Sequence, residues 1–314
     1  MDSTGFVESL KHKYNYSDKL VNALNEIIPQ LICFYGVKYK DHIEKAISSV
    51  EIIECDPSHS ISTVLSDLSF LNSSNVSIVD QKIKNQGSVY IAYPEVVYDE
   101  FLQSYIIKNV KRYIVLAHFH NLDSPKGKAT LVRELAKLIR SFHNEFIVDG
   151  DNLITRTGLK KTYRKLTNKV DILVSLLRVE NSGLEEGINS YEEEKITSLV
   201  IDDNYETFDY DLPKKVAYIL YEKLNLKDLV LSSSIMASGD LEREYDLNSD
   251  LFGYLSELVD DALKLEDLNH DVNITKDGKD RVKEELEVIE HAIGDNMIAY
   301  LTLSRSDPVK NLDA

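Results

Sequence analysis

The sequence predicts an α+β protein, with strands in the middle of the chain and helices at both ends. Apolar residues recur three and four positions apart near both termini, which is typical of helices that bury one face. Short β-branched and aromatic runs fall between these regions and predict strands. We therefore expect an N-terminal helical segment over residues 1–75, a core over residues 76–201 and a C-terminal helical subdomain over residues 202–314.

The composition is that of a globular protein, with 43% apolar and 28% charged residues in a chain of 314. The formal net charge of −17 creates a field that repels phosphate backbones and anionic lipids, so we expect neither nucleic acid nor membrane as a partner. The N-terminus lacks the apolar region of a signal peptide, and no stretch approaches the roughly 20 apolar residues of a membrane helix. These features favour a cytoplasmic protein, in which Cys33 and Cys55 are reduced and structural.

The N-terminal region predicts two helices between Ser17 and Val50, with Gly36 as the stop of the first and Pro29 as a kink within it. The second helix is expected to run through the pattern HIEKAISSVEII. The Ser- and Asn-rich residues 56–77 suggest a short helix between loops.

The central region predicts strands over residues 89–93 and 112–119, followed by a helix whose apolar rhythm is clearest in LVRELAKLIRSF, residues 131–142. Ser124 is expected to cap this helix and Pro125 to occupy its first position. Gly127 weakens the first turn, so the helix is expected to begin near Lys128. A hairpin with a type I′ turn at Asp149-Gly150 follows.

The C-terminal half reads as helices almost to its end. Helical spacing returns at residues 181–202 and continues in the ranges 212–224, 226–236, 249–265 and 280–293.

The central helix also has the spacing of a zinc-hydrolase helix. In the motif H-E-x-x-H, two histidines four residues apart ligate the metal and the glutamate activates water, while a glutamate on a second helix supplies the third ligand. Here Glu134 stands at the glutamate position, but Arg133 and Lys137 stand where histidines would be.

Residues 89–198 resemble the zincin-like metallopeptidases of the gluzincin type. Three blocks carry the resemblance, namely KGKATLVRELAKLIRSFHNEF, IVDGDNLITRTGL and GLEEGINSYEEEKI. The resemblance implies a zincin-like core, with a small mixed sheet and active-site-type helices. It also implies that Glu134 is a vestigial general base and Glu186 a vestigial metal ligand, with Arg133 and Lys137 at the histidine positions.

The two substitutions change the expected chemistry. Guanidinium and ammonium groups have no lone pair for a metal, and two positive charges repel a divalent cation. We therefore expect no cofactor and no proteolytic activity, with the cations of Arg133 and Lys137 paired to Glu134 and Glu186. The resulting hypothesis is a pseudopeptidase that serves as a binding or regulatory protein for a protein or peptide partner.

Two other interpretations remain open. His118 and His120 point the same way in a strand, and His143 follows the helix, so these residues are alternative zinc ligands of a working peptidase. Alternatively, the helix is an ordinary buried helix with Glu134 on its charged edge, and the chain is an acidic helical interaction protein unrelated to peptidases. No nucleotide-binding or serine-hydrolase motif supports a further class.

Overall fold

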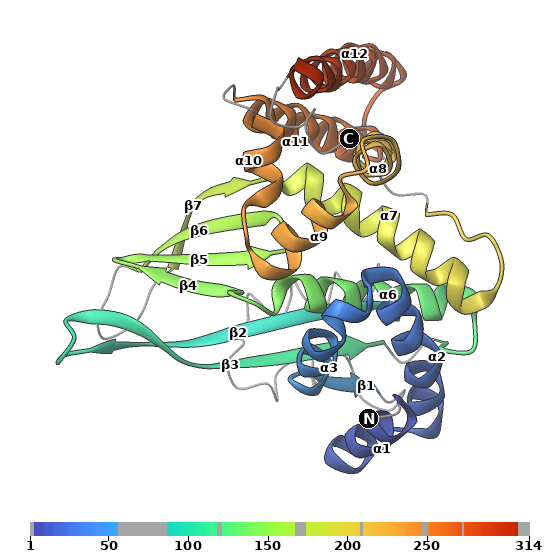
Figure 1. Cartoon of the computed structure of the whole chain (residues 1–314), viewed down its shortest axis with the longest axis vertical. Coiled ribbons are helices and arrows are strands. Elements are labelled where there is room, and N and C mark those ends of the chain that lie inside the picture. The colour runs from blue at the N-terminus through green and yellow to red at the C-terminus, as the bar shows by residue number, and fades with distance from the viewer. Residues whose placement is uncertain are drawn as a thin grey trace.

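The computed structural model describes residues 3–55, 87–117, 121–166, 174–207, 210–246, 250–271 and 273–306. It confirms an α+β fold. Two long helices cross the middle of the molecule, the strands extend from them to one side, and the N-terminal and C-terminal helices lie at opposite ends (Figure 1). The predicted short helix within residues 56–77 lies outside the described residues.

The two predicted N-terminal helices are confirmed as α2 (Asp18–Tyr35) and α3 (Lys40–Ser48), separated by a short 3-10 turn, η1 (Val37–Tyr39). Gly36 ends α2 with a φ of 100°, which favours glycine, and α2 continues through Pro29. An unpredicted helix, α1 (Ser3–Tyr14), precedes them. The prediction that the second helix continues through EII was wrong, because β1 (Glu51–Glu54) forms there.

The first sheet is mixed and has the strand order β1-β3-β2. β1 runs parallel to β3 (Ser104–Leu116), which pairs antiparallel with β2 (Ser88–Asp99). The two predicted strands are thus the base of a hairpin that is longer than expected. Pro94 lies inside β2 because an edge strand tolerates a residue without an amide proton.

The second sheet is antiparallel, in the order β4-β5-β6-β7. The predicted hairpin is confirmed as β4 (Phe146–Asp149) and β5 (Asn152–Thr157), but its turn residues are Gly150 and Asp151. Of these two, only Gly150 has a positive φ, which fits a type II′ turn and not the predicted type I′. β6 (Lys160–Leu166) and β7 (Val174–Glu180) were not predicted.

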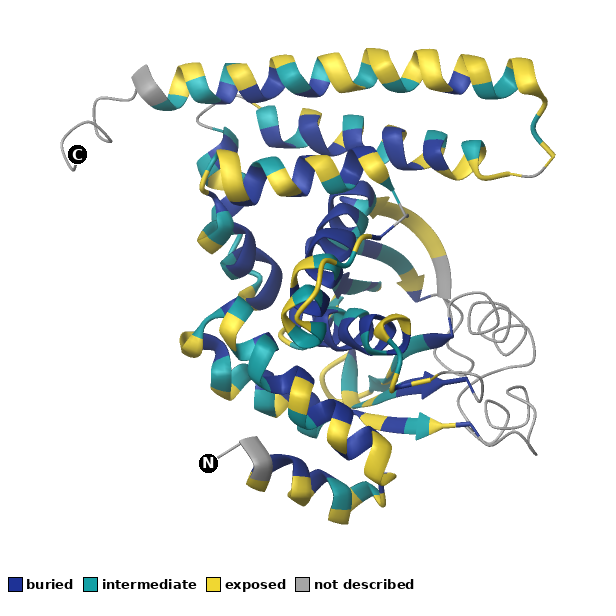
Figure 2. Ribbon diagram, turned by 90° about the vertical axis from the view of Figure 1, so that its right-hand side faces the viewer, coloured by how far each residue is buried: buried dark blue, intermediate teal, exposed yellow. Residues whose placement is uncertain are grey.

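The helices of the C-terminal half match most of the predicted ranges. They are α7 (Ser182–Ile201), α8 (Asp211–Tyr218) with the π-turn η2 (Ile219–Lys223), α9 (Lys227–Met236), the unpredicted α10 (Asp240–Asp246), α11 (Leu251–Asn269) and α12 (Lys276–Ser306). α12 lies along the top of the molecule with a largely exposed outer face (Figure 2).

One continuous hydrophobic core joins the three segments that the sequence predicts. It includes Leu24 of α2, Leu135 of α6 (Pro125–Ser141) and Leu255 of α11, each with no exposed surface. The central helices are accordingly among the most buried elements (Figure 2). α6 and α7 pack against each other, so any chemistry of their facing side chains takes place in the interior.

Among the described residues, no single helix has both the length and the hydropathy to cross a membrane. The bent pair Asp18–Tyr35 and Val37–Ser48, with an angle of 115° between its parts, meets these criteria only when taken together.

Candidate functional site at the interface of α6 and α7

The start of α6 is fixed by a cap and by a close backbone approach. Ser124 accepts a hydrogen bond from the Gly127 amide at 3.0 Å, and Pro125 occupies the first turn, as predicted. The helix begins at Pro125, not near Lys128. Gly127 allows this early start because a Cβ atom at this position would lie 1.7 Å from the Asn121 carbonyl oxygen.

The side chain of Glu134 is buried and bonded through both oxygens. Oε1 accepts from the Ser88 hydroxyl at 3.1 Å and lies 3.3 Å from Arg133 Nε, while Oε2 accepts from the Tyr90 amide at 2.9 Å. Burial raises the pKa of this carboxyl, but Lys137, Arg133 and the two hydrogen bonds outweigh burial and lower the pKa below 4.5. Glu134 is therefore a carboxylate at neutral pH, and a weak base.

The two cations of the motif have different surroundings. Arg133 Nε lies 3.3 Å from Glu134 Oε1 and 4.0 Å from Glu193 Oε2, so the guanidinium stands between carboxylates of α6 and α7. Lys137 is half-buried and close enough to lower the pKa of Glu134, but its ammonium group forms no ion pair within the described part of the chain.

Glu186 does not join this group. It accepts a hydrogen bond from the side-chain Nδ2 of Asn189 at 3.5 Å, and among the described residues it forms no ion pair with Arg133 or Lys137. Arg133 meets Glu193 while Arg140 meets Glu185, so α6 and α7 run antiparallel. Glu186 precedes Glu193 by two helical turns, about 10 Å along the axis. The structure thus brings Arg133 and Lys137 close to Glu134, as predicted, but places Glu193 and not Glu186 beside Arg133.

A second ion cluster lies deeper in the same interface. Arg140 Nη1 lies 2.8 Å from Glu185 Oε1, and Arg140 Nε lies 3.0 Å from Glu192 Oε2; none of the three side chains is exposed. Arg140 also donates to Asn189 Oδ1. Tyr35 and Tyr221 each donate to Glu192 at 2.7 Å, which joins α2 and η2 to the cluster.

The charges of this cluster do not balance, because one guanidinium faces two carboxylates. Burial raises the pKa of Glu185 to about 7, although Arg140 and the Leu159 amide lower it. Burial lowers the pKa of Arg140, but Glu185 and Glu192 outweigh burial and raise it, so the guanidinium stays charged. The sequence analysis did not predict this cluster. The pattern that indicates it is a spacing of seven residues, between Arg133 and Arg140 and between Glu185 and Glu192, because residues seven apart lie on the same face of a helix.

Arg156 connects the end of α6 to the second sheet and to α9. Its guanidinium donates to the carbonyls of Gly158 at 2.7 Å and Ser234 at 2.5 Å, and to those of Arg140 and His143. Burial lowers the pKa of Arg156 to about 10. These bonds to carbonyls hold the end of α6, the second sheet and α9 together.

Of the three alternative zinc ligands, the structure describes only His143. His118 and His120 lie outside the described residues, and His143 is exposed after the end of α6. Within the ranges that the structure describes, no three His, Cys, Asp or Glu side chains gather closely enough to hold a metal ion.

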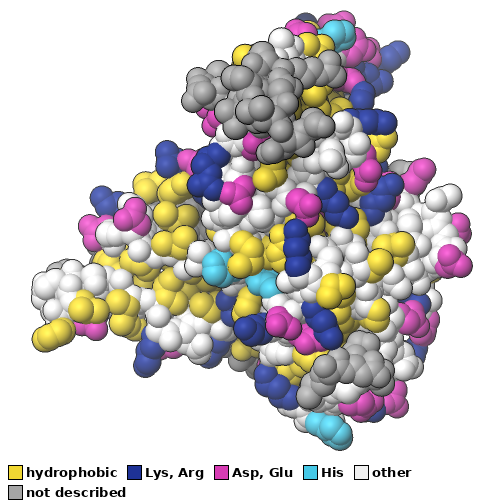
Figure 3. Space-filling view, in the orientation of Figure 1, with side chains coloured by type: hydrophobic (Ala, Val, Ile, Leu, Met, Phe, Trp, Pro, Cys, Tyr) yellow, Lys and Arg dark blue, Asp and Glu magenta, His cyan; other side chains and the backbone are white. Residues whose placement is uncertain are grey.

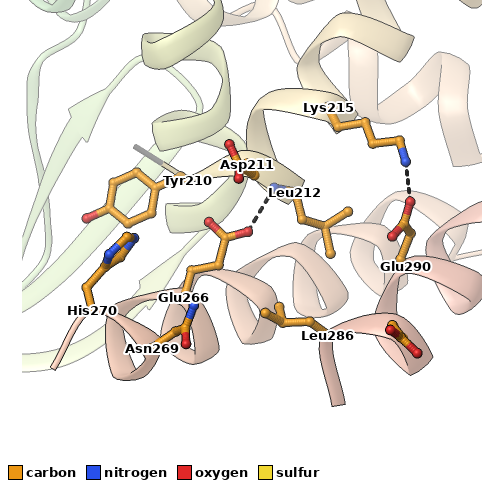
Figure 4. Close-up of a pocket in the computed structure, with 10 residues that line it drawn as sticks. Tyr210, Asp211, Leu212, Lys215, Glu266, Asn269, His270, Leu286 and Glu290 are labelled. Carbon is orange, nitrogen blue, oxygen red and sulfur yellow. Dashed lines mark hydrogen bonds and ion pairs between the residues drawn. The ribbon is translucent and has the colours of Figure 1, made fainter. Parts of the chain in front are cut away.

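A cavity of about 340 Å³ lies elsewhere, between the start of α8, the end of α11 and α12 (Figure 4). The Tyr210 and His270 rings lie on one side, and the ion pair of Lys215 and Glu290 on the other. Glu266 in its wall accepts from the Leu212 amide at 2.8 Å. The wall thus includes a helix cap and an ion pair, and none of the predicted site residues lines this cavity.

No family model, no curated protein and no solved structure matches this chain.

Proposed function

We propose that this chain is a zincin-like pseudopeptidase, a binding protein that does not hydrolyse peptides. The observation that carries the proposal is the position of the Arg133 guanidinium between Glu134 of α6 and Glu193 of α7. In the gluzincin-type peptidases that this chain resembles, the zinc ion lies between the H-E-x-x-H helix and a carboxylate of a second helix. In the proposal, the guanidinium supplies the positive charge of the metal and keeps two buried carboxylates paired.

The environment of Glu134 supports the absence of hydrolysis. A general base needs an accessible oxygen and a pKa near the working pH. Both oxygens of Glu134 have donors within the protein, the side chain is 2% exposed, and its pKa is lowered. Glu134 instead covers the amide of Tyr90 on the edge strand β2, which gives this carboxylate a structural role.

The partner in this proposal is a protein or peptide met in the cytoplasm. The net charge of −17 disfavours long-range attraction to nucleic acids and to anionic membranes.

Zinc titration by calorimetry tests the proposal, together with an assay of cleavage of a fluorogenic peptide library. The wild type should bind no stoichiometric zinc and cleave none of the peptides. Arg133→His with Lys137→His should create zinc binding, because two imidazoles would then stand four residues apart beside a carboxylate of α7. Either single change should bind zinc much more weakly.

The third ligand can be identified in the double variant. Adding Glu193→Gln should weaken zinc binding, whereas adding Glu186→Gln should leave it unchanged, because Glu193 is the carboxylate that meets position 133. About one zinc per wild-type chain, with peptide cleavage that His118→Ala and His120→Ala remove, would overturn the proposal in favour of a working peptidase. Equal, negligible zinc binding by all folded variants would leave an interaction protein unrelated to zincins.

A further inference from the structure

The outer edge of the four-stranded sheet is apolar, and no further strand of the described part of the chain pairs with it. β7 is the last strand in the order β4-β5-β6-β7. Among the described elements, it makes extensive contact with β6 alone. Leu176, Leu177 and Val179 of this strand are 62%, 54% and 40% exposed. An exposed apolar edge strand offers unpaired backbone groups to another chain, and globular proteins avoid such edges unless they serve binding.

The last two strands of this sheet, β6 and the edge strand β7, carry the opposite charge to the rest of the protein. β6 and β7 together contain five Lys or Arg residues and one Glu, a formal charge of +4, in a chain whose net charge is −17. In the strand register, Arg164 lies opposite Leu176 and Lys165 opposite Ser175. Arg164 therefore lies beside an exposed leucine, and Lys165 lies beside the serine that precedes it. Figure 3 shows hydrophobic side chains over the strands at the left of the view, with Lys and Arg side chains at their border.

Two of these cations, Lys165 and Arg178, are exposed to solvent. Arg178 on β7 is largely exposed and lies over the Tyr163 ring, with 4.1 Å between the guanidinium carbon and the ring centroid. It also pairs with Glu180 at 3.1 Å, at the end of the strand. Lys165 is exposed, and no ion pair within the described ranges engages it.

We propose that the β7 edge binds an extended acidic peptide segment of a partner protein, which adds to the sheet as a fifth strand. The strand edge supplies backbone pairing, Leu176, Leu177 and Val179 contact apolar side chains, and Lys165 and Arg178 contact acidic ones. The exposed leucines favour a peptide over a nucleic acid, because a phosphate backbone gains nothing from aliphatic side chains. This site is separate from the interface of α6 and α7, so it stands whether or not the pseudopeptidase proposal does.

Fluorescence anisotropy with a labelled eight-residue peptide of alternating Val and Glu tests the proposal. The wild type should bind this peptide more tightly than its Val-Lys counterpart, and a proline in the centre should abolish binding, because it removes an amide from the new strand. The double variant K165E/R178E should weaken binding at low salt by about tenfold, the size expected for two lost charge contacts. K276E/K283E on α12 makes the same change of net charge elsewhere and should leave the affinity unchanged.

A second variant, L176N/L177N, should also weaken binding by about tenfold, since it removes the apolar contacts and keeps the charges. Circular dichroism checks that all three double variants are folded. Three outcomes would overturn the proposal. They are failure of the folded wild type to bind the Val-Glu peptide, tighter binding of a single-stranded oligonucleotide, and a dimer in sedimentation that L176N/L177N dissociates, which would make a second copy of this chain the occupant.

Discussion

Arg140 Nη1 lies 2.8 Å from Glu185 Oε1, and neither side chain has any exposed surface. This contact joins α6 to α7 at a point where water cannot replace a lost partner. Removing one member of a buried ion pair is costly because the other charge is left without compensation.

Arg140→Met should lower the free energy of unfolding by about 3–5 kcal/mol, the range for breaking a buried ion pair. The companion variant Arg140→Met with Glu185→Gln should lose less, because the glutamine side chain carries no charge and can still accept from the Leu159 amide. Urea denaturation of both variants measures the difference. A loss below about 1 kcal/mol in the single variant, the value typical of an exposed pair, would contradict the buried position of Arg140.

Stability should fall as the pH rises from about 4.5 to 7, because the pKa of Glu185 is raised in the folded protein. Its pKa is about 7 in the folded protein against 4.5 in the unfolded chain. The folded state therefore holds a proton that the unfolded state has lost in this range. The contribution is fully present below pH 4.5 and is lost through pH 7; the shift corresponds to about 3 kcal/mol.

Denaturation curves at several pH values isolate this contribution as the difference between wild type and Glu185→Gln. The variant should match the wild type near pH 5 and be more stable near pH 8. Glu257→Gln, the same change at an exposed position of α11, is the control and should keep the pH dependence of the wild type. Parallel curves for wild type and Glu185→Gln would show that Glu185 does not titrate in this range.

Glu134→Ala should expose the edge of the first sheet at Tyr90. The Glu134 carboxylate accepts from the Tyr90 amide and the Ser88 hydroxyl, so the alanine variant leaves two buried donors without a partner, at about 1–3 kcal/mol each. Hydrogen exchange should become faster at the Tyr90 amide and stay unchanged at Ile27, which is buried within α2. Unchanged exchange at Tyr90 would contradict the structural role of Glu134.

Local patterns were enough to predict the central helices. The apolar spacing in α6 and α7 is set by residues within one or two turns, and both helices form where that spacing predicts them. β6 was missed because KKTYRKL is rich in charged residues, although this strand lies within the sheet between β5 and β7. β1 was missed because a strand of four residues directly after α3 looks like one more helical turn.

The partner of Arg133 depends on information that the sequence pattern does not contain. Both Glu186 and Glu193 lie on the same stripe of α7, seven residues apart, so helical periodicity allows either to face α6. The choice follows from the antiparallel register, which Arg140 fixes through Glu185 and Glu192. That register joins residues more than forty positions apart and comes from tertiary packing.

Two glycines that lie within helices, Gly127 and Gly294, should respond to alanine in opposite ways. Gly127→Ala should destabilise the protein by about 1–3 kcal/mol, the usual cost of overpacking, because the new Cβ would lie 1.7 Å from the Asn121 carbonyl oxygen. Gly294→Ala in α12 should instead stabilise it by about 0.5–1 kcal/mol, since no atom lies within 4 Å of the new Cβ and alanine favours a helix. Thermal denaturation of the two variants in the same buffer checks both signs. A neutral Gly127→Ala would mean that the backbone of Asn121 does not approach the first turn of α6 as closely as described, and that the helix can begin without this contact.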